Sequence, residues 1–147
     1  MLLGLWPEPV FTVSDVYRET VETGLARGYP DVPAIQEAFD RRVLTIRKPR
    51  RSELLSGVGP TDSLVLLLAG EIPSAELLAN DHPLIRKAQQ REVPVLYTAE
   101  FVWQLHCIGR IAGDRCSALL REFVANERYT QDFMNAFVTQ RKPNGSD

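Results

Sequence analysis

The sequence contains few of the residues that form soft-metal sites. It has two cysteines, Cys107 and Cys116, and two histidines, His82 and His106. No histidine falls at the spacing that zinc sites use. We therefore expect the two cysteines to be buried thiols, or thiols without a functional role, rather than zinc ligands. The chain also lacks a long apolar run. Its opening MLLGLWP has no basic residue and soon reaches a proline. We therefore expect a cytosolic protein with no signal peptide and no membrane span.

The chain also has no excess of positive charge. Its 17 Lys and Arg residues are outnumbered by 19 Asp and Glu residues, giving a formal net charge of -2. A protein that binds nucleic acid through its overall field would be basic, so any such contact must be local. No glycine-rich phosphate loop follows an expected strand, which disfavours nucleotide binding by an unrelated Rossmann-like protein. With 147 residues, of which 44% are hydrophobic, the chain is predicted to be one domain, 1–147, with a real core.

Short β-like runs alternate with helical ones along most of the chain. We expect strands at 10–13, 43–46, 75–79 and 93–97. We expect helices at about 15–26, 33–39, 64–69 and 83–92. This rhythm predicts an α/β fold with a mostly parallel central sheet and flanking helices. Apolar spacing predicts further C-terminal helices within 114–141, the last of them carrying Phe133, Phe137 and Val138.

Helix starts and faces can be predicted at several positions. Ser14 is the expected N-cap of the first long helix, and Asp15 favours the positive end of its dipole. The buried stripe of this helix is expected to be Val16, Tyr17, Val21 and Leu25, and Gly28 is expected to end it. Thr61 with Asp62, and Thr98, are the expected caps of two later helices.

Three widely separated acids lie beside apolar runs: Glu19, Asp62 and Asp81. Carboxylates at or after the carboxyl ends of parallel strands converge in one cleft, and carboxylate oxygen is the ligand that Mg²⁺ prefers. Each acid also has a plain structural interpretation. Glu19 could be a solvated helix residue with Glu22 as a rival ligand, Asp62 could cap its helix, and Asp81 could serve the turn before the next helix.

The order of these motifs resembles a PIN domain. A Val-rich strand is followed by a VYRE-type helix, GPTD before LVLLLA, LLAND before a helix, and VPVLYT, over Val10 to Gly113. The resemblance implies a three-layer fold and a ribonuclease dependent on Mg²⁺ or Mn²⁺, of the toxin-antitoxin kind. It also implies RNA as substrate and a cognate antitoxin as partner. Its metal-binding and catalytic acids correspond to Glu19, Asp62 and Asp81, and Asn80 stands where a second acid often occurs.

The front of the chain departs from the family pattern, which begins with a central strand ending in Asp. Only nine residues precede Val10, and the one acid among them, Glu8, lies between two prolines. The start could lie upstream, the chain could be a natural truncation, or the first ligand could be lost. A catalytically silent PIN-like module that binds RNA or a protein is therefore the alternative function. A sheet without its central strand predicts low stability or a homodimer that covers the exposed edges.

The densest basic run is Arg47, Lys48, Arg50 and Arg51. Such runs are usually solvated loops. If this one flanks the cleft, it can hold phosphates and position an RNA strand without reading its sequence.

Overall fold

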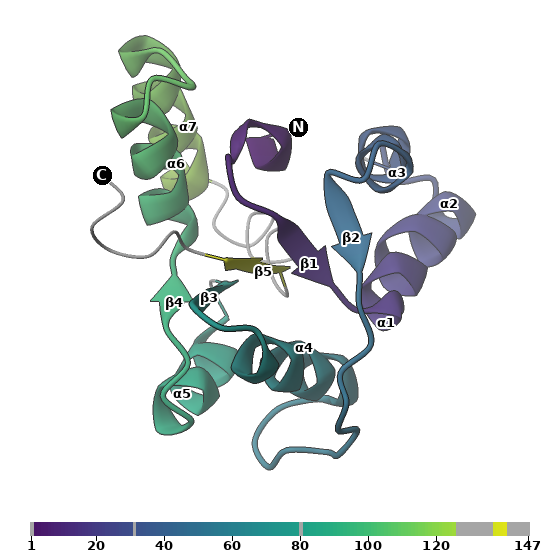
Figure 1. Ribbon diagram of the computed structural model, residues 1–147. Helices are drawn as coiled ribbons and strands as arrows, with labels where there is room; N and C mark the ends of the chain where they lie inside the picture. The colour runs from purple at the N-terminus through teal and green to yellow at the C-terminus, as the bar shows by residue number, and fades with distance from the viewer. Residues whose placement is uncertain (1, 31, 80, 126–136, 141–147) are drawn as a thin grey trace.

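A computed structural model describes residues 2–30, 32–79, 81–125 and 137–140. Its centre is a five-stranded sheet with the order β2-β1-β5-β3-β4 (Figure 1). The strands are β1 (Val10–Thr12), β2 (Leu44–Ile46), β3 (Ala75–Leu78), β4 (Val95–Leu96) and β5 (Phe137–Gln140). β1 pairs with β2 and β3 with β4 in parallel, whereas β5 runs antiparallel to both β1 and β3. The predicted α/β class is confirmed, but the described sheet is mixed rather than mostly parallel, because two of its four strand pairings are antiparallel.

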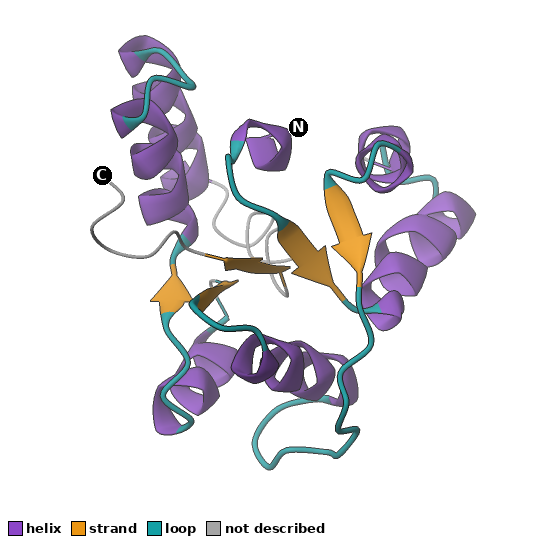
Figure 2. Ribbon diagram, in the orientation of Figure 1, coloured by secondary structure: helices purple, strands orange, loops and turns teal. Residues whose placement is uncertain are grey.

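Helical segments surround this sheet. They are η1 (Leu2–Leu5), α1 (Ser14–Tyr17), η2 (Arg18–Glu22), α2 (Thr23–Arg27), α3 (Val32–Asp40), α4 (Pro60–Glu71), α5 (His82–Gln90), α6 (Thr98–Cys107) and α7 (Gly113–Ala125). In Figure 2, α4 and α5 lie on the opposite side of the sheet from α6 and α7, and a long loop joins β2 to α4. Among the described residues, no helix is both long and apolar enough to cross a membrane.

The main core contains α4 and β3. The run at 64–69, predicted as a buried helix, lies within α4, where Leu66 and Leu68 are inaccessible to solvent. All four residues of β3 are buried because helices cover both of its faces, as in a parallel sheet. Both cysteines are free thiols; Cys116 is buried and Cys107 is exposed.

The centre of the sheet corrects the prediction of a last helix. Phe137 and Val138 were expected in a helix but belong to β5, and Phe133 lies outside the described residues. The β-branched and aromatic residues of this segment suit a strand, and the free edges of β1 and β3 give its backbone hydrogen-bonding partners on both sides. Thr139 is buried and donates from Oγ1 to the carbonyl oxygen of Pro9 at 3.2 Å. The sheet is therefore continuous at its centre.

The first long helix is interrupted by a π-turn, η2. Val16 and Val21 are buried as predicted, but Leu25 is 59% exposed, contrary to its assignment to the same stripe. Hydrogen bonds from i to i+5 widen the turn, so residues five apart come to the same face and later residues are rotated. The Thr20 hydroxyl, within this turn, donates to the carbonyl oxygen of Val16 in α1 at 2.7 Å.

Gly24 occupies the buried face that Leu25 leaves. A Cβ at Gly24 would lie 2.6 Å from Cγ2 of Val32, so α3 packs directly on this backbone. Gly28 then ends the helix, as predicted, with a positive φ of 70°. The amide of Tyr29 donates to the carbonyl of Gly24 at 3.0 Å, which completes a C-terminal cap.

Candidate functional site

The carboxyl ends of β1 and β3 lie at the same edge of the sheet, because both strands run antiparallel to β5. We call this the carboxyl edge. α1 begins at Ser14, directly beyond β1, and α5 begins at His82, shortly beyond β3. The three acids predicted from sequence belong to the helical segments that follow these strands and to the start of α4.

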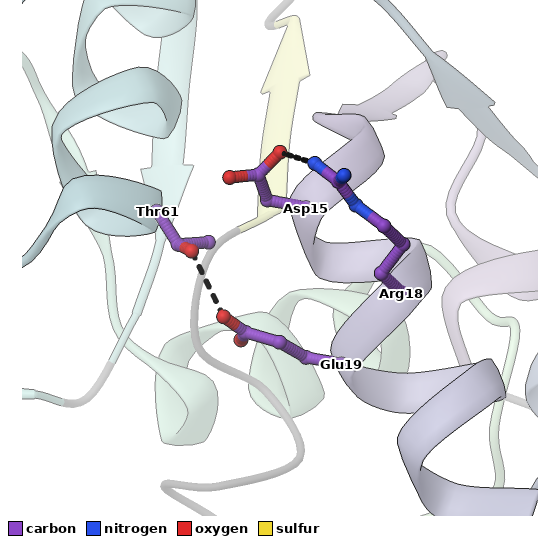
Figure 3. A network of polar contacts seen from close by, with 4 residues as sticks. All are labelled: Asp15, Arg18, Glu19 and Thr61. Carbon is purple, nitrogen blue, oxygen red and sulfur yellow. Dashed lines mark hydrogen bonds and ion pairs between the residues drawn. The ribbon is translucent and has the colours of Figure 1, made fainter.

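Glu19 is linked to the start of α4. The Thr61 hydroxyl donates to Oε1 of Glu19 at 2.9 Å, across 42 positions of sequence. Figure 3 shows the two side chains reaching toward each other from η2 and α4. Glu19 is exposed, as its structural interpretation required, but it points to another element rather than only to solvent. This hydrogen bond joins η2, which contains Glu19, to the first turn of α4, which contains Asp62.

Asp62 does not cap its helix, contrary to one of the predictions. Gly59 is the N-cap of α4, Pro60 occupies its first turn, and no side chain makes a capping hydrogen bond. The half-buried Asp62 carboxyl group therefore makes no capping hydrogen bond. Burial raises the pKa of Asp62, and the negative charges of Asp81 and Glu19 raise it further. Asp62 is thus within electrostatic range of both other acids.

Asp81 has a demonstrable structural role. Its Oδ2 accepts a hydrogen bond from the Leu84 amide at 3.1 Å, so it is the N-cap of α5. The side chain is half-buried, and its negative charge contributes to the raised pKa of Asp62. A capping carboxylate retains a second oxygen for another contact, so the cap and a ligand role are compatible. Asn80 lies outside the described residues.

Asp15 is an acid that the sequence analysis assigned only to the helix dipole. It is half-buried in the first turn of α1 and forms an ion pair with Arg18. Figure 3 shows its carboxylate on the side of the helix that faces Thr61, one turn before Glu19. The sequence could have indicated Asp15 as a candidate, because it follows β1 in the same way as Asp81 follows β3. Ser14, the predicted N-cap, is instead the first helical residue after Val13.

The basic run begins at the carboxyl edge. The Arg47 amide donates to the Thr12 carbonyl at 2.9 Å, which continues the β1–β2 ladder, and its guanidinium lies 5.1 Å from the centre of the Phe11 ring. Lys48 is exposed. These two residues are therefore the part of the basic run that leaves the sheet beside the acids.

The rest of the basic run is held at the other end of α4. The amides of Arg50 and Arg51 donate to Oε1 of Glu71 at 2.6 and 3.3 Å, and the Arg51 guanidinium also pairs with Glu53 at 3.3 Å. Glu71 is the last residue of α4, nine positions after Asp62, or about 14 Å along the helix axis. Arg50 and Arg51 are thus anchored at the opposite end of α4 from the acids.

The acid cluster suits a hard cation by its donor chemistry. Carboxylate oxygens are the ligands of Mg²⁺ and Mn²⁺, and a cation would relieve the repulsion that Asp62 experiences. Across the described residues, however, no three or more Asp, Glu, His or Cys side chains are already gathered as a metal-binding group. Mg²⁺ keeps several waters and takes few protein ligands, so a cation held by these acids would be bound partly through water.

The chain matches no family model, no curated protein and no solved structure. A functional assignment therefore depends on the residues at the carboxyl edge and on the order of the sequence motifs.

Proposed function

We propose that the chain is a metal-dependent endoribonuclease of the PIN type, with a PIN-like three-layer fold. Glu19, Asp62 and Asp81 would hold Mg²⁺ or Mn²⁺ at the carboxyl edge. The observation that carries the proposal is the Thr61 to Glu19 hydrogen bond, because it joins η2 to the turn of α4 that contains Asp62. The negative charges of Asp81 and Glu19 raise the pKa of Asp62, and this effect is a second support for the proposal.

The proposed chemistry follows from the residue types. When bound, the cation would activate a water and stabilise the negative charge that develops on the phosphoryl oxygens. The three carboxylates supply oxygen donors whose mutual repulsion is relieved by a positive charge. Arg47 and Lys48, which leave the sheet at the same edge, would attract the RNA backbone without reading its sequence. A cognate antitoxin protein would be the partner.

The test is cleavage of single-stranded RNA by the purified chain with Mn²⁺ or Mg²⁺. Asp81→Asn is the sharpest variant because Asn is as good an N-cap as Asp, so α5 keeps its cap while the site loses a charge. We expect metal-dependent cleavage by the wild type and none by this variant. Asp114→Asn is the matched control, since Asp114 is likewise an acid at the start of a helix, in the first turn of α7, and the substitution should leave cleavage unchanged. Undiminished cleavage by Asp81→Asn would reject the assignment.

A catalytically silent module that binds RNA or a protein is the second candidate. Two observations favour it: the described acids do not form a ready-made metal-binding group, and β5, between β1 and β3, runs in the reverse direction. The amino end of β5 therefore lies at the carboxyl edge. A parallel strand in the same place would have had its last side chain at this edge. RNA binding that needs no metal and produces no cleavage would favour this function.

A further inference from the structure

Thr61 has a hydroxyl group whose hydrogen bond serves neither its own helix nor the core. We propose that Thr61 is a positioning residue, which holds the Glu19 carboxylate in the orientation that a divalent cation requires. This inference rests on the proposed function, since it concerns the same carboxylates. It adds a residue that touches the cation only through Glu19.

The hydrogen bond leaves the metal-binding capacity of Glu19 intact. Thr61 has one hydroxyl proton, and it goes to Oε1 at 2.9 Å. Among the described residues, Oε2 of Glu19 has no hydrogen-bonding partner and remains available to a cation. An exposed glutamate otherwise samples many rotamers, and a fixed donor on a second element reduces that freedom. Partners of this kind orient metal ligands in proteins generally.

A structural role in α4 does not account for the Thr61 hydroxyl. Gly59 is the N-cap of α4, and no side chain caps this helix. A threonine in the first helical turn could have bonded to its own backbone, as Thr20 does to the Val16 carbonyl. Thr61 instead bonds across to η2.

The π-turn determines where Glu19 can point. Val16 and Val21 are both buried, so η2 is fixed on that face while Glu19 stays on an exposed one. π-turns inside helices are frequent at functional sites, because they redirect side chains without breaking the helix. The π-turn determines the direction in which the Glu19 side chain leaves the helix, and the hydrogen bond from Thr61 fixes the orientation of its carboxylate.

The experiment is a titration of the full chain with Mn²⁺ alone, followed by electron paramagnetic resonance. Thr61→Val removes the donor at nearly constant shape, and Thr61→Ser restores it. Thr23→Val is the matched control, because Thr23 is exposed on α2 and its hydroxyl makes no hydrogen bond among the described residues. We expect Thr61→Val to weaken Mn²⁺ binding about tenfold, with Thr61→Ser and Thr23→Val within about twofold of the wild type.

A second background separates positioning from a general loss of structure. Glu19→Gln removes the carboxylate through which Thr61 acts, so adding Thr61→Val to it should change Mn²⁺ affinity by less than about twofold. The melting temperature of Thr61→Val should match that of the wild type. Equal Mn²⁺ affinity of Thr61→Val and the wild type would overturn the positioning role and leave the nuclease proposal standing. No Mn²⁺ binding by the wild type would overturn both.

Discussion

Gly24→Ala should destabilise the protein although alanine is the better helix former. The new Cβ would lie 2.6 Å from Cγ2 of Val32, about 1 Å closer than carbon atoms normally approach. Val32 is 2% exposed and packs with Val21 and Ile35, so it has little room to move. A valine in a helix is also confined to one main rotamer. The contact must therefore be relieved by separating α2 from α3.

The size of the effect follows from two opposing terms. Overpacking of a core costs about 1–3 kcal/mol, while replacing glycine by alanine within a helix contributes up to about 1 kcal/mol. We expect a net loss of about 1 kcal/mol, and at most about 2. For a chain of this length, each kcal/mol lowers the melting temperature by about 2–4 °C.

The assay is urea unfolding followed by circular dichroism, with Gly70→Ala as the control. Gly70 lies in α4, where an added Cβ would meet nothing within 4 Å. The same substitution there should raise the free energy of unfolding, by at most about 1 kcal/mol. Opposite signs for the two variants are expected. If Gly24→Ala stabilises the chain as much as Gly70→Ala does, the close packing of α3 on α2 is wrong.

Two further variants test local features. Asp62→Asn should raise the free energy of unfolding at pH 7 by up to about 1 kcal/mol, because it removes a charge that is disfavoured by burial and by repulsion from Asp81 and Glu19. Because the pKa of Asp62 is raised in the folded state, its contribution to stability falls as pH rises above 3.8. The stabilisation by Asp62→Asn should therefore vanish near pH 3. Urea unfolding at pH 7 and pH 3 measures this, and an equal stabilisation at both pH values would contradict it. Gly28→Ala should cost about 1–2 kcal/mol, because φ is 70° there while the space around it is open. An unchanged melting temperature would contradict that backbone strain.

The sequence predicted the elements whose signals are local. β1, β2, β3 and β4 and the helices between them follow from apolar runs bounded by turn residues, and Gly28 ends its helix as expected. The π-turn could not be predicted, since the spacing of Val16 and Val21 is also compatible with an α-helix. Leu25 was misassigned for that reason, and Gly24 packs against Val32 in its place.

The remaining errors concern contacts between distant segments. The spacing of Phe137 and Val138 is ambiguous, and only the open edges of β1 and β3 decide in favour of a strand. Thr61 and Asp62 fit a capping pattern, but Gly59 and Pro60 start α4 without them. The link from Thr61 to Glu19 spans 42 positions, and no local pattern encodes it. The proposed metal set and the expected homodimer remain predictions.

The position of β5 has a consequence for biosynthesis. Thr139 contacts Pro9 across 130 positions of sequence, and β5 lies between the β1–β2 pair and the β3–β4 pair in the described sheet. A growing chain on the ribosome can form either pair early, but the two cannot be joined until residue 140 has left the exit tunnel. Until then, both inner edges are open to pairing with other nascent chains, so the risk of aggregation persists until β5 has joined the sheet.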